Sequence, residues 1–561
     1  MEIQSTGVKA MSLTGHSRKW SLLLVALVIS LLSIAASAQQ SKLGTVNFPT
    51  SGSPEAQAHF LRGVAALHSF WYEEALDEFR EATRIDPDFA MGYWGEAMTY
   101  NHPLWAQQDT EAARKALAKI KDTMKITPRE RAFINAVRIL YGEGDKLARD
   151  RAYAAAMEKV YRDYPDDEAA CFYALSLLGT VRPGDKGFAR QMRAGAIALS
   201  VYERNPNHPG AAHYIIHSFD DPEHAILALP AARRYAEIAP EAHHARHMPA
   251  HIFLQLGMWP EAAASNESAW AVSDAWVKRK NLSLSLRDYH SLHWLLYVYL
   301  QQGRYSKAKE LLAVKRNDMA SSGGNMDVGR YNEDMAAAFV VETEAWDAAA
   351  KYFAGPDEAK SGASDHAIHG GAQPAPQMSG RGDGLAVFIG GLTAAKLGST
   401  EAEKSVAELE SIARRLADNK EPYRARIVEI RALEVKAALA ASKNNYDEAI
   451  ELMKRATTLE EEMSPPSGPP TLIKPSHELF GEILLAAGRA KEAEQQFNTA
   501  LARQPNRARS LIGAARAAAR SGDGKRAAEI YSAFLRQWQQ ADQQLPELRE
   551  AQDYLKQASA R

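Results

Sequence analysis

The sequence has very little cysteine, no surplus of charge of either sign and, beyond its first 40 residues, no long apolar run. Cys171 is the only cysteine among 561 residues, so an intrachain disulfide and a thiolate metal cluster are both excluded. The 67 basic and 69 acidic side chains give a formal net charge of −2, which provides no electrostatic reason to expect nucleic acid as a partner. No later segment offers the roughly 20 apolar residues of a spanning helix, so we expect no stable membrane insertion of the mature chain.

The N-terminus has the pattern of a signal peptide. A basic pair at 18–19 precedes an apolar run at 20–34, and small residues follow at 36–38. The run is shorter than the roughly 20 residues that a membrane anchor needs. We therefore predict a signal peptide over 1–38, cleaved after Ala38, and an exported protein that is periplasmic or secreted.

Small and aromatic residues recur at fixed offsets in two distant parts of the chain. Offsets of 0, 12, 16, 19 and 24 separate Gly63, Ala75, Phe79, Ala82 and Pro87, and the same offsets separate Gly481, Ala493, Phe497, Ala500 and Pro505. Small residues let two helices approach closely, the aromatic ring fills the groove between them, and proline ends the second helix. These spacings resemble the tetratricopeptide repeat, a pair of antiparallel helices of about 34 residues.

The repeats predict an all-α fold, a superhelical solenoid of tetratricopeptide-repeat hairpins arranged in two arrays. No stretch shows sustained period-two alternation, so no strands are expected. A stretch rich in glycine and proline interrupts the helical pattern and is typical of a loop or linker. The predicted organisation after the signal peptide is an N-terminal extension at 39–55, an N-terminal array with a His-rich groove at 56–354, a loop or linker at 355–381 and a C-terminal array at 382–561.

Histidines are concentrated in one region, since ten of the 17 lie between His208 and His293. Two of them, His213 and His217, are four residues apart and share one face of a helix. A second pair with the same spacing, His247 and His251, lies 34 residues later, which is the length of one repeat. We therefore expect equivalent positions on adjacent first helices, facing the concave groove of the array. A proline between the members of the second pair, Pro249, is expected to kink or restart its helix.

From this register we predict two sets of site residues. The predicted metal ligands are His213, His217, His247, His251, His290, His293 and Asp220. The other predicted ligand-binding residues are His68, His102, His244, Arg246, Arg287 and Tyr297.

Three interpretations of these residues remain open from the sequence. The first is a site for a divalent transition metal such as zinc, which imidazoles bind at about 2.0–2.1 Å. The second is a groove for a peptide or small anionic ligand, with histidines donating hydrogen bonds beside Arg246 and Arg287. The third is a set of half-buried histidines that only join neighbouring helices and the pair Asp220-Asp221.

These interpretations lead to different functions. A binding scaffold with a metal or ligand in its groove is the leading hypothesis. A metal-dependent hydrolase or oxidoreductase is an alternative, with Asp220, Asp221 or Glu267 as acid or base and a bound water as nucleophile. The other alternative is a cofactor-free array that binds a protein or peptide partner.

Three histidine-rich blocks carry a closer resemblance. They read HPGAAHYIIHSFDDP, APEAHHARHMPAHIF and RDYHSLHWLLYVYLQQGR. With the earlier stretch LHSFWYEEALDEF they resemble the signature blocks of a group of large exported bacterial tetratricopeptide-repeat proteins, over about residues 56–320. The resemblance implies the solenoid fold and a shared central feature, and it implies no particular activity.

Overall fold

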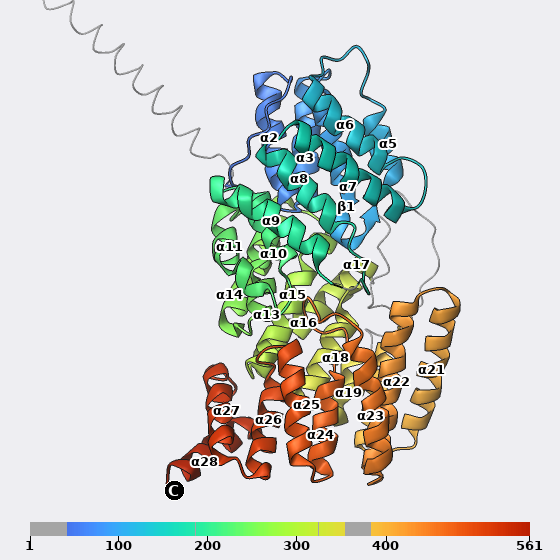
Figure 1. Cartoon of the computed structure of the whole chain (residues 1–561), viewed down its shortest axis with the longest axis vertical. Coiled ribbons are helices and arrows are strands. Elements are labelled where there is room, and N and C mark those ends of the chain that lie inside the picture. The colour runs from blue at the N-terminus through green and yellow to red at the C-terminus, as the bar shows by residue number, and fades with distance from the viewer. Residues whose placement is uncertain (1–41, 186, 324, 354–382, 561) are drawn as a thin grey trace, which may run out of the picture. The chain divides into compact units, whose positions relative to one another are not determined.

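The computed structural model describes residues 42–185, 187–323, 325–353 and 383–560. The predicted signal peptide and the predicted linker at 355–381 lie outside the described residues. Residues 43–561 cluster into one compact unit, in which helices follow one another as a stack (Figure 1). The part of the chain that the structure describes is almost entirely helical, which confirms the all-α fold class.

The helices before the undescribed segment 354–382 are α2 (Pro54–His68), α3 (Tyr72–Ile85), α4 (Ala90–Thr99), α5 (Thr110–Leu117), α6 (Pro128–Leu140), α7 (Lys146–Asp163), α8 (Asp167–Leu178), α9 (Ala189–Arg204), α10 (Pro209–Ser218), α11 (Ala225–Ile238), α12 (His243–His247), α13 (Pro249–Gln255), α14 (Trp259–Lys280), α15 (Tyr289–Gln301), α16 (Tyr305–Ser321), α17 (Met326–Gly329), α18 (Asn332–Thr343) and α19 (Ala349–Phe353). Three short 3-10 helices are η1 (Pro103–Trp105), η2 (Leu284–Leu286) and η3 (Trp346–Ala348). The helices after that segment are α20 (Leu385–Lys396), α21 (Glu401–Asp418), α22 (Pro422–Ser442), α23 (Tyr446–Glu461), α24 (Ser476–Ala486), α25 (Ala490–Arg503), α26 (Ala508–Ser521), α27 (Gly524–Gln537) and α28 (Pro546–Ser559).

One small departure from the expected all-helical chain follows α4. Two strands of two residues each, β1 (Asn101–His102) and β2 (Gln107–Gln108), pair antiparallel around η1. A pair this short buries no apolar face, which explains why the sequence shows no alternating pattern there.

Close packing between helices explains the repeated glycines. A Cβ atom at Gly63 would lie 2.7 Å from the Phe79 ring, and one at Gly95 would lie 2.3 Å from it. No side chain fits at that distance, so the aromatic ring sits directly against both helix backbones. The same arrangement joins Gly481, Phe497 and Gly513, with distances of 2.7 and 2.3 Å.

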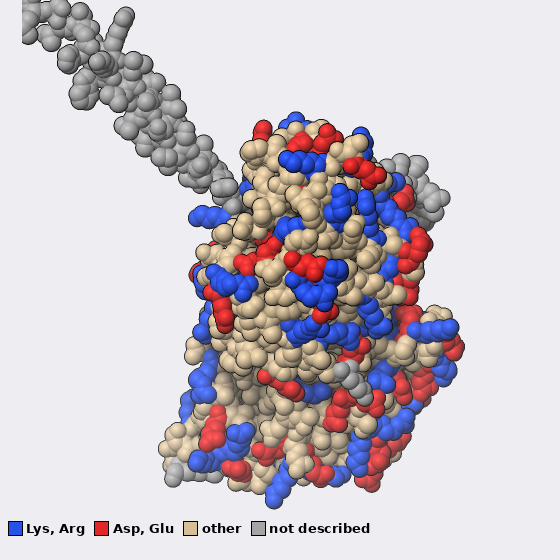
Figure 2. Space-filling model, turned by 45° about the horizontal axis from the view of Figure 1, so that its top comes forward, with Lys and Arg blue, Asp and Glu red and all other residues tan. Residues whose placement is uncertain are grey.

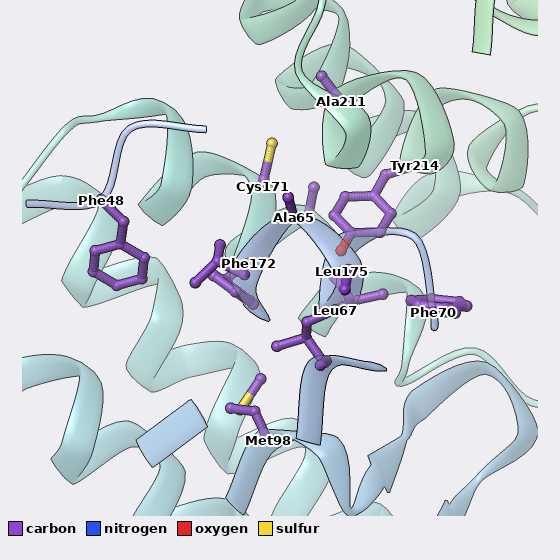
Figure 3. Close-up of a cluster of buried hydrophobic side chains, with 14 of the residues drawn as sticks. Phe48, Ala65, Leu67, Phe70, Met98, Cys171, Phe172, Leu175, Ala211 and Tyr214 are labelled. Carbon is purple, nitrogen blue, oxygen red and sulfur yellow. The ribbon is translucent and has the colours of Figure 1, made fainter. Parts of the chain in front are cut away.

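The core near the N-terminal end joins residues that are distant in sequence. Figure 3 shows Phe48, Phe172 and Tyr214 among the buried side chains of this cluster. The same cluster holds Cys171, which is buried, and burial raises the pKa of its thiol. Helices α2, α8 and α10 are therefore fixed to one another, and these helices carry or support the histidines.

The two sides of the undescribed segment 354–382 pack against each other. Trp259 Nε1 donates a hydrogen bond of 2.9 Å to the Asn506 carbonyl, and Trp538 Nε1 donates one of 3.0 Å to the Gln301 carbonyl. A single core cluster contains buried residues from both sides, such as Phe339 and Phe388. Helices α13 to α22 thus share one apolar core, and helices α22 to α28 form a neighbouring core cluster.

The surface charge and the hydropathy of the helices agree with the near-zero net charge and with the lack of a long apolar run after the first 40 residues. On the face shown in Figure 2, basic and acidic side chains are interspersed and neither sign forms a continuous field. Within the described ranges, none of the helices combines the length and the apolar character needed to cross a membrane.

Candidate metal centre

A cavity of about 570 Å³ lies beside the histidine-rich helices. Its wall includes residues of α10, α12, α13 and α15 on one side and a proline-rich strap, residues 464–472, on the other. The strap is held closely: Gln255 Nε2 donates a 2.9 Å hydrogen bond to the Pro466 carbonyl, and a Cβ at Gly468 would lie 2.4 Å from Trp294. The cavity is large enough for a small ligand.

The structure brings six histidines together as two groups of three. The first histidine group consists of His213, His217 and His244, and the second histidine group consists of His247, His251 and His290. Within each group, one nitrogen per ring lies within 4.8 Å of the others. Both groups reach the cavity, because His217, His244, His251 and His290 line it.

Helix starts and a helix break position these rings. Helix α10 begins with Pro209, and the side chain of its N-cap, His208, accepts a hydrogen bond from the Ala211 amide. The predicted restart at Pro249 is present: α12 ends at His247 and α13 begins at Pro249, but the intervening Met248 keeps α-helical dihedral angles. His247 and His251 therefore still face each other, as on one continuous helix.

Hydrogen bonds fix the tautomer of both His247 and His251. Asn266 uses its amide nitrogen to donate to the Ala262 carbonyl, so its Oδ1 accepts the 2.7 Å hydrogen bond from His247 Nδ1. His251 Nδ1 donates to the Asp220 carboxylate at 2.6 Å. In neutral rings both protons are then on Nδ1, and each Nε2 carries a lone pair.

These two lone pairs face each other. The Nε2 atoms of His247 and His251 are 3.1 Å apart, a contact that two acceptors do not make without a cation between them. Two imidazole nitrogens that bind one ion at 2.0–2.1 Å lie about 2.9–3.4 Å apart at angles of 90–110°. The observed separation therefore matches two ligands of one ion.

The first histidine group has similar geometry. His213 Nδ1 donates a 2.6 Å hydrogen bond to the His68 carbonyl, which leaves Nε2 as the free nitrogen. That Nε2 lies 3.2 Å from His244 Nε2. The third member, His217, has an Nε2 atom that is buried without a hydrogen-bond partner among the described residues. An unpaired buried nitrogen is costly, so a bound ligand there would restore its lost interaction.

Burial holds the imidazoles of His213, His217, His244, His247 and His290 neutral, which is the form that binds metal. Burial lowers the pKa of His213 to about 3 and that of His290 to about 4. Burial, with neighbouring histidines adding to it, also places the pKa of His217, His244 and His247 well below 6.5.

We expect the metal-free protein to lose stability on acidification from pH 7 to pH 5. His213, His290 and His293 have folded-state pKa values of about 3, 4 and 3, against 6.5 for free imidazole. The unfolded state therefore binds more protons below pH 6.5, and the stability present above that pH declines toward the folded-state values. The expected loss is on the order of 5 kcal/mol at pH 5. Urea unfolding with a chelator present measures it, and equal free energies at both pH values would refute this linkage.

A third buried cluster is already satisfied by protein partners. His68 Nε2 and His208 Nε2 lie 2.8 and 3.3 Å from the two oxygens of Glu168, and His68 Nδ1 lies 2.8 Å from the Tyr214 hydroxyl. Burial alone would raise the pKa of the Glu168 carboxyl, but the two histidines hold it well below its usual range. We interpret this cluster as a structural network that joins α2, α8 and α10.

Two predicted metal ligands lie next to the groups without belonging to them. Asp220 accepts hydrogen bonds from His251 Nδ1 and Gln255 Nε2, so it orients a histidine rather than joining the three-residue groups. His293 lines the cavity with its ring stacked on Tyr331, and neither ring nitrogen has a hydrogen-bond partner in the described part of the chain. Conversely, His244 was predicted only as a ligand-binding residue and belongs to the first histidine group.

Five other predicted ligand-binding residues do not line the cavity. His68 is in the core rather than at the groove edge, because α2 packs that face against α8 and α10. His102 stacks on Tyr72 with ring centroids 3.9 Å apart. The others have protein partners: Arg246 donates to the Pro240 carbonyl, Arg287 pairs with Asp274 and Asp318, and Tyr297 accepts a hydrogen bond from Arg507.

The predicted acid and base candidates are also separated. Asp221 lines the cavity and pairs with His224 at 2.8 Å. Glu267 is outside the cavity wall and accepts a 2.6 Å hydrogen bond from the Tyr299 hydroxyl. Of the two, Asp221 is the one that a ligand in the cavity can reach.

Sequence reasoning missed the opposite wall of the cavity. The strap lies more than 170 residues after His293 in the sequence. Trp294 and Tyr331 also line the cavity, and neither was predicted as a site residue. A single sequence contains no signal that these segments meet.

Comparison with solved structures finds repeat proteins of low identity. A tetratricopeptide repeat protein from Parabacteroides merdae is 14% identical, with 56% of this chain and 97% of that chain covered and a TM-score of 0.28. Human IFIT1, solved as a dimer with m7Gppp-AAAA, is 14% identical, with 87% and 91% covered and a TM-score of 0.32. Among curated proteins the sequence finds no match.

Family models match the chain in three places. Each is described as a tetratricopeptide repeat, and they cover residues 56–89, 430–463 and 479–542. The first covers α2 and α3, and the third covers both helix pairs that pack around Phe497. The two places where the sequence showed matching offsets are thus both matched as repeats. The chain therefore contains tetratricopeptide repeats at these three places.

Proposed function

We propose that this protein is an exported scaffold whose cavity binds a transition metal through the two histidine groups. Tetratricopeptide repeats support a role as a protein-interaction scaffold, and the metal would place a reactive or ligand-binding centre within it. The residues proposed to bind are His213, His217 and His244 in one group and His247, His251 and His290 in the other.

The facing lone pairs of His247 and His251 carry this proposal. Their Nε2 atoms lie 3.1 Å apart, while both Nδ1 atoms donate to fixed oxygen acceptors. In metal sites, a histidine ligand usually donates its second ring N–H to a carboxylate or a carbonyl oxygen. A merely structural pair would place a donor opposite an acceptor.

A second candidate function is metal-dependent catalysis. Three histidines with a water in the fourth position form a known catalytic zinc arrangement, whereas structural zinc sites have four protein ligands. Here each group supplies three histidines and opens on a cavity of about 570 Å³. An ion bound there would polarise a substrate or lower the pKa of its water, and Asp220 and Asp221 would be the carboxylates in the cavity wall.

Export is part of the proposal because of the signal-peptide pattern over 1–38. A metal site made of imidazoles suits an oxidising compartment, since it contains no thiolate that oxidation would destroy. The mature chain would begin after Ala38.

Metal analysis of the purified full chain, prepared without a histidine tag, tests the proposal. We expect about two equivalents of transition metal per chain, and chelation followed by zinc addition should restore them. The variant His68→Gln is the matched control, because it alters the buried network and leaves both groups intact. Metal far below one equivalent, with no uptake on zinc addition, would contradict the proposal and leave the interaction scaffold.

A further inference from the structure

The repeat register places the two histidine groups side by side. Each group contains a pair four residues apart, His213 with His217 and His247 with His251, and the pairs are one repeat apart. Neighbouring helices in such packing lie about 8–10 Å apart. Two equivalent three-histidine sites therefore occupy adjacent positions along the stack.

A single helix supplies one histidine to each group, so the two groups lie next to each other. Helix α12 provides His244 to the first group and His247 to the second, with ring centroids 5.9 Å apart. Across the groups, the centroids of His217 and His251 are 5.7 Å apart. Members of both groups line the same cavity, so the free coordination positions of two ions would face one space.

We propose that the two groups hold a pair of copper ions that act as one dinuclear centre, an inference that rests on the proposed metal binding. Imidazole suits zinc, copper, iron and nickel, and copper(II) binds nitrogen ligands most strongly of these divalent ions. Neither group contains a carboxylate or a thiolate, so the ligands bring no negative charge of their own.

Because the ligands are uncharged, the two sites favour copper, which has a stable monovalent state. Coulomb repulsion scales with the product of the charges, so two copper(I) ions at a given separation repel each other about fourfold less than two divalent ions. Zinc has no monovalent alternative. The carboxylate of Asp220, which lies 2.6 Å from His251 Nδ1, offsets part of the positive charge.

Copper loading followed by electron paramagnetic resonance tests the inference. The full chain, freed of metal and supplied with copper(II), is expected to bind two ions, yet to give a spin signal well below two spins and a half-field transition from coupled ions. His290→Gln, which removes one member of the second group, is expected to bind one copper with a full, uncoupled signal. His217→Gln should do the same in the first group, while His293→Gln should keep the coupled pair.

Two outcomes separate this inference from the proposed function. Two bound copper ions with two independent spins, or binding of zinc and no copper, would overturn the copper pair and leave metal binding intact. Binding of neither zinc nor copper would overturn both.

Discussion

Replacing His247 and His251 together by glutamine is expected to remove one of two bound metal ions and to leave the other in place. Loss of a hydrogen-bond partner behind a ligand already weakens metal binding about 10–100-fold, so loss of two of three ligands should weaken this site by more than about 100-fold. Glutamine keeps a polar side chain of similar length, and Asn266 and Asp220 remain able to hydrogen-bond to it. Zinc titration by calorimetry, with metal analysis after dialysis, measures the result.

The control for this variant uses histidines outside both groups. His59 lies within α2, is partly exposed and pairs with Glu78, and His102 stacks on Tyr72 away from the cavity. The double variant His59→Gln, His102→Gln should bind metal like the unaltered chain. If both double variants keep two ions with unchanged affinity, His247 and His251 are not ligands.

Replacing Arg507 by methionine is expected to destabilise the protein by about 3–5 kcal/mol. The guanidinium is fully buried and lies 2.6 Å from Glu342, 2.8 Å from Glu478 and 3.0 Å from the Tyr297 hydroxyl. Without it, two buried carboxylates lose their cation where the helices on either side of segment 354–382 meet. Burial already raises the pKa of the Glu342 carboxyl, and loss of the cation should raise it further.

Thermal and urea unfolding measure this effect, with Arg516→Met as the matched control. Arg516 pairs with Glu550 at 2.7 Å, but both side chains are about one-third exposed. An exposed pair of this kind contributes about 0–1 kcal/mol. Equal losses for the two variants would show that the buried cluster around Arg507 does not join the helices as described.

Much of the fold could be predicted from the sequence because its signals are local. Offsets between Gly63, Phe79 and Pro87 reflect contacts within one repeat, and these contacts are determined by helical spacing alone. The spacing between His213 and His247 equals one repeat length. It therefore predicts that the two histidines occupy equivalent positions on the first helices of successive repeats. For the same reason the pairs His213–His217 and His247–His251 could be placed on adjacent helices.

The rest of the candidate site depends on contacts between distant segments. Nothing near His68 in the sequence indicates that Glu168 and His208 enclose it. Likewise, Tyr297 shares a helix face with His290 and His293, yet Arg507 from the far side of segment 354–382 covers it. Helical periodicity identifies a face, but the element that packs on that face is determined by the whole chain.

The most direct measurement is anomalous diffraction from crystals of the metal-loaded protein, collected at the absorption edge of the bound metal. Two anomalous peaks are predicted, each about 2.0–2.1 Å from one nitrogen of every histidine in its group. A metal-loaded crystal with no peak beside His217 or His251, or with metal bound only between His68, Glu168 and His208, would contradict the account.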